Sequence, residues 1–266
     1  MYYFIKFCCL RRVTSLIVVT LGFFTTTVFA GQGGKSLSIV ADEWCPFNCS
    51  KDSLDQGFVI DMTKDILEAA GFDIDYTTQA WTSALDDVKA GRKDAVVGAS
   101  REEAQGLIMV EEPFGEHKNC FYTRVADPFI YSSVGALAGR RIAIAAGYLY
   151  GEPLDSYISS NRSNFNRIQM ATGEQPLLIN IRKLESRRVD TVIENLQVMD
   201  YSLRKYRLSG IRLAGCDAPT PIYMAISPKR EDAGKVASML ALGIRKMRQT
   251  GKMRELLARY GLSDWK

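Results

Sequence analysis

The chain has 266 residues, with 34 Lys+Arg against 30 Asp+Glu, 47% hydrophobic residues and 24% charged residues. This composition excludes wholesale disorder, and the length suffices for one or two domains that need no disulfide scaffold. A net charge of +4 is too small to indicate nucleic-acid binding. The single histidine, His117, excludes most Ser-His and Cys-His catalysis and any metal site with two His ligands.

Residues 1–30 are predicted to be a secretory signal peptide. Basic residues precede an apolar run at 16–24, and Val28-Phe29-Ala30 supplies the small-x-small pattern that signal peptidase cleaves, so we expect cleavage after Ala30. A retained membrane anchor is the alternative, but the run is shorter than the roughly 20 residues that a spanning helix needs. No later stretch approaches 18 apolar residues, so we expect the mature protein to be soluble and exported.

Removal of the signal changes the charge and the cysteine count. It leaves 31 Lys+Arg against 30 Asp+Glu, a net charge of +1, and four of the six cysteines. Outside the cytoplasm an even number of cysteines favours disulfides. Cys45 and Cys49 are spaced to close a short loop, and Cys120 and Cys216 would then join two distant segments. A metal site at the C-x3-C pair is not favoured, because no histidine or second cysteine pair lies near it in the sequence.

The first half of the mature chain alternates strands and helices. In chain order the pattern predicts a strand at 36–41, a helix at 59–70 ended by Gly71, a strand at 73–76, a short helix at 84–90 ended by Gly91, and a strand at 94–98.

The second half repeats this alternation. It predicts a strand at 141–146, a helix through 154–158, a helix at 175–187, strands at 189–193 and 222–227, and helices at 235–248 and 253–260. Strand-helix alternation is typical of parallel sheets flanked by helices, which is an α/β architecture. The last two helices have no sheet of their own and are expected to return to the first half.

One junction occurs in both halves. The segments at 91–97 (GRKDAVV) and 186–193 (SRRVDTVI) each end a helix in basic residues and start a strand near an aspartate. Such junctions are common, but one in each half indicates two similar α/β lobes.

Several segments in this order resemble one known family. They are ADEWCPFN, GFVIDMTKDILEAAGF, AWTSALDDVKAGRKDAVVG, FYTR, LAGRRIAIAAG, SRRVDTVIEN, IYMAIS and MRQTGKMRELLARYGL. The ordered set is similar to the family 3 extracellular solute-binding proteins, the periplasmic receptors of polar amino-acid ABC importers. The resemblance covers nearly all of the mature chain.

The resemblance implies a type II periplasmic-binding-protein-like fold. Each lobe is a sheet flanked by helices, a two-strand hinge joins the lobes, and the ligand is enclosed between them by hinge closure. The implied division is lobe 1 at 31–125, lobe 2 at 126–218 and a return to lobe 1 at 219–266. The implied protein is a periplasmic monomer that binds a small molecule and then contacts a membrane permease or sensor, with no cofactor and no metal.

The resemblance also implies a set of ligand-binding residues. Trp44 and Trp81 match aromatic positions of the family's pocket, although tryptophans at these places can also fill the cores of the lobes. Backbone groups at the end of a strand are implied at Gly98, Ala99 and Ser100. Gly147 and Tyr148 match a strand-to-helix turn, where helix N-terminal N–H groups would hold a carboxylate.

Two departures leave the identity of the ligand open. Amino-acid-binding members use an arginine for the α-carboxylate at the position of Gly106, so here Arg101 would have to take that role. Otherwise Arg101 is a surface residue. The family's ammonium-binding aspartate corresponds to Asn195, which carries no charge, while Glu194 is expected to point to the opposite face of the strand.

Other functions remain open on the same scaffold. An enzyme would draw its acids and bases from Glu194, Asp42, Glu43 and His117, although the last is expected in a solvated turn. A protein that reports its ligand to a membrane sensor is a further alternative. The absence of a GxxxxGK[ST] segment excludes the ATPase of an importer.

Overall fold

The computed structural model describes residues 1–3 and 35–266. Apart from its first three residues, the predicted signal peptide and its cleavage after Ala30 lie outside the described residues. Within the described segments, no helix combines the length and the apolar character of a membrane span.

Two mixed sheets form the framework of residues 35–266. The first contains, in spatial order, β2 (Phe72–Thr78), β1 (Lys35–Ala41), β3 (Ala95–Ala99), β11 (Thr220–Ile226) and β4 (Ile108–Met109), with β5 (Gly115–His117) paired to β11. The second contains β10 (Ile211–Cys216), β6 (Asn119–Arg124), β9 (Thr191–Asn195), β7 (Ile142–Ala145) and β8 (Ile168–Ala171). In the first sheet β2, β1 and β3 are parallel, and β11 is antiparallel to β3. In the second sheet β8, β7 and β9 are parallel, β6 is antiparallel to β9, and β10 is antiparallel to β6.

Alternation along the strands places helices on both faces of each sheet. In β1, Leu37 and Ile39 join the apolar cluster of α1, α6 and α7, whereas Val40 joins the cluster of α2. In β7, Ala143 joins the cluster of α4 and α5, whereas Ile144 joins that of α3. The helices are α1 (Phe58–Leu67), η1 (Glu68–Ala70), α2 (Trp81–Ala90), η2 (Val134–Leu137), α3 (Leu154–Asn161), α4 (Pro176–Glu185), α5 (Leu196–Lys205), α6 (Ala233–Thr250) and α7 (Lys252–Arg259).

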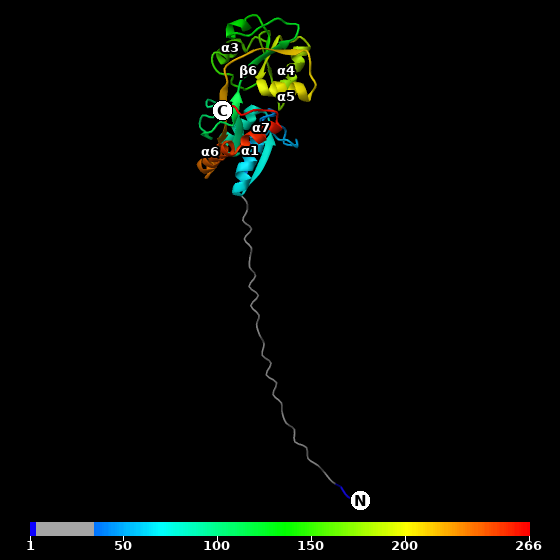
Figure 1. Ribbon diagram of the computed structural model, residues 1–266, viewed down its shortest axis with the longest axis vertical. Helices are drawn as coiled ribbons and strands as arrows, with labels where there is room; N and C mark the ends of the chain where they lie inside the picture. Colours follow the sequence, from blue (N-terminus) through cyan, green and yellow to red (C-terminus); the bar gives the residue numbers. More distant parts are fainter. Residues whose placement is uncertain (4–34) are drawn as a thin grey trace. The chain divides into compact units, whose positions relative to one another are not determined.

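The chain passes between the two sheets twice. It leaves the first sheet after β5, enters the second at β6, and returns from β10 to β11. We call residues 35–117 with 220–266 the first lobe and residues 119–216 the second lobe. Figure 1 shows α1, α6 and α7 around the first lobe and α3, α4 and α5 around the second. The predicted boundary after residue 125 differs from this sheet membership, because β6 pairs with β9 and β10 of the second sheet.

The two similar junctions occupy equivalent places in the two lobes. β1 lies parallel to β3 as β7 lies parallel to β9. In each case the aspartate before the second strand accepts a backbone N–H from within the first strand or from the residue just before it. Ser38 N donates to Asp94 at 2.7 Å, and Arg141 N donates to Asp190 at 3.1 Å. The Arg141 guanidinium also bonds Asp190 and holds the pKa of that carboxyl at about 2.

Most expected elements are present, and the differences have local causes. The helix expected after Gly147 begins only at Leu154, after a turn. Several elements were not expected from the pattern. They are β4, β5, β6, η2, β8, α5 and β10. β4 and β5 contain two and three residues, too few to show alternation.

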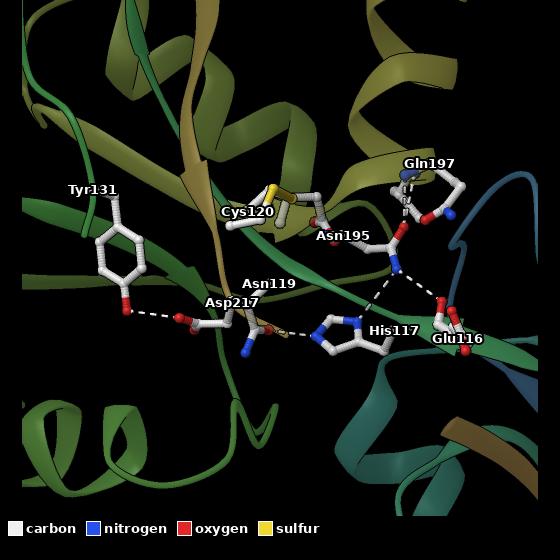
Figure 2. The surroundings of a disulfide bond; sticks show 11 residues. Glu116, His117, Asn119, Cys120, Tyr131, Asn195, Gln197 and Asp217 are labelled. Carbon is white, nitrogen blue, oxygen red and sulfur yellow. Dashed lines mark hydrogen bonds between the residues drawn. A yellow bond between two sulfur atoms is a disulfide. The ribbon is translucent and has the colours of Figure 1, made fainter. Parts of the chain in front are cut away.

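All four cysteines of the expected mature chain form disulfides, which confirms that prediction. Cys45 pairs with Cys49, and Cys120 pairs with Cys216. The second bond joins the start of β6 to the end of β10, at the point where both crossovers enter the second lobe (Figure 2). It therefore fixes the two crossover strands to each other.

We expect the two disulfides to contribute unequally to stability. The bond between Cys120 and Cys216 closes a loop with a sequence separation of 96, against 4 for Cys45 and Cys49. Removing a disulfide restores loop-closure entropy to the unfolded chain, so we expect C120A/C216A to lower the free energy of unfolding by about 4.7 kcal/mol, and C45A/C49A by about 2 kcal/mol. Urea denaturation of the two double variants measures this difference. An equal or larger loss from the short loop would contradict it.

Candidate functional site

A cavity of about 340 Å³ lies between the two lobes. Asp42, Ser100 and Tyr148 line it, and each follows the carboxyl end of a parallel strand, namely β1, β3 and β7. Ligands of open α/β sheets bind at such strand ends. The hinge strands β5 and β11 supply further wall residues, so both lobes and the hinge enclose one space.

Asp42 takes part in a hydrogen bond between the two lobes, at the wall of the cavity. Its side chain is 4% exposed, and Tyr148 Oη of the second lobe donates a hydrogen bond to its Oδ2. Burial raises the pKa of Asp42 to about 6, although the Tyr148 hydrogen bond opposes the rise. The bond needs an acceptor on Asp42 and spans the cleft, so it exists only when the lobes approach.

Glu194 makes a second connection between the lobes. It is 5% exposed and accepts hydrogen bonds from Trp44 Nε1 of the first lobe at 2.9 Å and from Asn195 N at 2.8 Å. Burial raises its pKa to about 7. The expectation that Glu194 turns away from the ligand side is wrong, because its carboxylate reaches a tryptophan that lines the cavity.

Asn195 has a structural role at the end of β9. It is fully buried, and its Oδ1 accepts from Gln197 N and Val198 N, which caps α5. Its Nδ2 lies 3.5 Å from His117 Nδ1 (Figure 2). Asn195 is not among the residues that line the cavity.

His117 lies in the hinge and not in a solvated turn, so that expectation is wrong. It belongs to β5, pairs with Thr220 of β11 and lines the cavity. Nε2 hydrogen-bonds Asn119 Oδ1 (Figure 2). The centroid of the His117 ring lies 5.5 Å from that of Trp44. Burial lowers its pKa. An isolated histidine between short polar segments gives no sequence signal of such a position.

Trp81 is held at the start of α2 by a half-buried acid that the sequence did not single out. Its Nε1 donates to Glu103 Oε1 at 3.0 Å, and Glu103 Oε2 accepts from Ser100 N at 2.9 Å. Ser100 Oγ in turn accepts from Glu103 N at 3.2 Å, which is the reciprocal pattern of a capping box. Burial raises the pKa of Glu103. The S-x-x-E spacing was the available signal for this residue.

The remaining expected site residues divide into two groups. Trp44, Trp81, Gly98, Ser100, Arg101 and Tyr148 line the cavity, whereas Ala99 and Gly147 do not. Arg101 is exposed, and its Nη2 donates to Tyr223 Oη at 3.1 Å. The expected helix N-terminus at Gly147 and Tyr148 is wrong, because α3 begins at Leu154.

Gly147 instead permits close approach of the lobes. Its φ is +80°, and a Cβ there would lie 2.2 Å from Thr82 Cγ2 of the first lobe. A side chain would therefore collide with α2 while also straining the backbone. Only glycine allows the turn after β7 to pack against the start of α2.

Glu194→Gln is expected to change the pH dependence of stability. Because the folded protein raises the pKa of Glu194 from 4.5 to about 7, it binds this proton more tightly than the unfolded chain. The free energy of unfolding therefore falls as pH rises between these values, by about 3 kcal/mol. The permanently neutral glutamine should escape this loss, so the variant should match the wild type at pH 5 and exceed it at pH 8.

Urea denaturation at the two pH values measures this effect as a difference from the wild type. His117 shifts in the opposite direction, so the wild-type slope alone is not the test. The exposed Glu185→Gln is the matched control and should give the same difference at both pH values. The explanation is contradicted if Glu194→Gln also differs from the wild type equally at pH 5 and pH 8.

Comparisons with known proteins agree with this geometry. The sequence matches the bacterial extracellular solute-binding proteins, family 3, over residues 37–263. No curated protein sequence matches it significantly.

Three solved structures illustrate the similarity of fold. A histidine kinase sensor domain with similarity to periplasmic binding proteins aligns with a TM-score of 0.70 and 17% identity, over 85% of this chain and 96% of that one. A structure from work on glutathione import through GshT and a cystine ABC importer of Streptococcus mutans gives 0.72 and 15%, over 85% and 95%. The arginine-, lysine-, histidine-binding protein ArtJ from Geobacillus stearothermophilus gives 0.69 and 16%, over 87% and 97%.

At these identities the three structures establish the fold and not the ligand. They confirm the expected two-lobe type II periplasmic-binding-protein fold. Since the family match spans nearly all of the described residues, the chain belongs to the bacterial extracellular solute-binding proteins, family 3.

Proposed function

We propose that this protein is the periplasmic receptor of an ABC importer, which captures a small polar solute by closing its two lobes around it. The observation that carries the proposal is the cavity of about 340 Å³, whose walls come from both lobes and from the hinge. A space of this size suits a small metabolite. A ligand that contacts both lobes stabilises the closed form over the open one, and a membrane protein can recognise that form.

Two tryptophans are the proposed stacking surfaces for the solute. Trp44 is 7% exposed and Trp81 is 6% exposed, and both line the cavity. Their indole N–H groups are bonded to Glu194 and Glu103. The bond between Trp81 and Glu103 lies within the first lobe, so it can fix the orientation of Trp81 before the ligand arrives, which lowers the entropy cost of binding. The bond between Trp44 and Glu194 joins the two lobes and forms on closure.

The family assignment supports export of the protein and a role in import of its solute. Cleavage of the signal peptide after Ala30 remains part of the proposal. One alternative has support of its own: the structural similarity to a histidine kinase sensor domain fits a receptor that signals to a membrane sensor. Pull-down of the closed, ligand-bound protein with candidate membrane partners distinguishes the two.

We propose that the protein binds its ligand without turnover. Mass spectrometry of a bound ligand after incubation with the protein tests whether the ligand is converted by an enzyme activity.

A thermal-shift screen of amino acids and small polar metabolites tests the receptor function. A ligand at 100 times its Kd should stabilise the folded protein by about 2.7 kcal/mol through mass action. For a ligand identified in this way, Trp81→Phe should weaken binding, because the smaller ring stacks less and no longer donates to Glu103.

Trp265→Phe is the matched control for this substitution. Trp265 packs under Arg248 in the first lobe and does not line the cavity, so its substitution should leave the affinity unchanged. The site assignment fails if Trp81→Phe and Arg101→Ala both bind the ligand as tightly as the wild type does. The receptor function fails if no solute raises the melting temperature.

A further inference from the structure

The charges around the cavity are unbalanced. Three buried or largely buried acids lie in or beside it, namely Asp42, Glu103 and Glu194. Within residues 35–266, none of the three forms an ion pair with a lysine or an arginine. Arg101 is the one lysine or arginine among the lining residues, and it is exposed and hydrogen-bonded to Tyr223.

These acids differ in how well their oxygens are satisfied. Glu103 and Glu194 each accept hydrogen bonds from a tryptophan and from a backbone N–H. Asp42 is as buried as Glu194, but only Tyr148 donates to it, through Oδ2. Its Oδ1 accepts no hydrogen bond from another residue in the described part of the chain. A buried carboxylate without a cationic partner is costly, and Asp42 lines the cavity, so a ligand can supply that partner.

The remaining walls of the cavity also suit a cation. Five aromatic residues line it, and their negative ring faces attract positive charge. They are Trp44, Trp81, Tyr148, Tyr150 and Tyr223. Four of the five are less than 9% exposed, so a cation against them would be largely shielded from water. The attraction between a cation and an aromatic ring is strongest when water is excluded.

The cavity offers much less to an anion. No helix begins at Gly147 or Tyr148, so no N-terminal N–H groups are available there. The guanidinium of Arg101 lies 4.6 Å from the ring centroid of Tyr223, at the exposed edge of the site. A carboxylate on the ligand would therefore gain little compared with an ammonium beside Asp42.

We propose that the cavity binds an organic cation, an amine or a guanidine, with its charge against Asp42 and the aromatic walls, and that the ligand needs no carboxylate. This inference rests on the proposed receptor function and names its substrate class. It predicts that the amino acid and its decarboxylated amine bind alike.

Calorimetry on the exported protein tests this with matched pairs of ligands. The probes are arginine with agmatine and lysine with cadaverine, and glutamine and glutamate serve as the neutral and anionic comparisons. We expect at least one decarboxylated amine to bind within about threefold of its amino acid, or more tightly, and at least about tenfold more tightly than glutamine or glutamate. Tighter binding of glutamine or glutamate than of all four cations overturns the inference, as does a preference of more than about tenfold for both amino acids over their amines.

Substitution of the acid locates the cation. Asp42→Asn keeps the size and an acceptor oxygen but removes the charge, and should weaken the best amine at least about tenfold. Asp52→Asn removes an exposed carboxylate outside the cavity and should leave binding unchanged. Tyr148→Phe leaves the charge of Asp42 in place and should retain the preference for cations even if closure weakens.

Each outcome is assigned to one of the two proposals. If Asp42→Asn binds the amine as tightly as the wild type does, the inference is wrong. If no cation binds while another solute raises the melting temperature in the broad screen, the inference falls and the receptor function stands. If nothing binds in either experiment, both fall. Should Asp42→Asn fail to fold, as shown by circular dichroism, the matched ligand pairs with wild-type protein still decide.

Discussion

Burial of acids between the lobes is the constraint on which the rest of the site depends. Asp42 and Glu194 are buried where the lobes meet, and each accepts a hydrogen bond from the opposite lobe. Burial without a cation raises the pKa values of both acids, so closure works against their charge. A ligand that supplies positive charge would relieve this cost. The same acids accept hydrogen bonds from Tyr148 and Trp44, which line the cavity. The charge of the acids and the shape of the cavity therefore depend on the same contacts.

The hinge is built so that closure has few degrees of freedom. The disulfide between Cys120 and Cys216 joins the two crossover strands at their second-lobe end (Figure 2). On the first-lobe side, His117 pairs with Thr220 across β5 and β11. The two crossovers are therefore tied to each other at both ends, by the disulfide in the second lobe and by strand pairing in the first. Because Gly147 lets α2 approach within van der Waals distance, the two lobes can then meet closely.

Periodicity in the sequence predicted most of the first sheet and most of the helices, but it missed β6, β8 and β10 of the second sheet and did not predict the site. The apolar runs and glycine stops predicted the elements that were found, since these patterns report burial along a regular element. Side-chain partners across the cleft are set by tertiary packing, which periodicity does not contain. That is why Glu194 was assigned to the wrong face and His117 to a solvated turn. The pairing of β9 with β6 is regular through Asn195, but it is Glu194 that reaches a cavity residue, whereas Asn195 caps α5.

Small-angle X-ray scattering with and without ligand tests the central claim most directly, because it measures closure of the two lobes in solution. With the tightest solute from the screen added at saturation, the radius of gyration should decrease and the scattering curve should approach that calculated for the closed arrangement described above. Saturating binding with no change in the radius of gyration or the scattering curve would contradict the account.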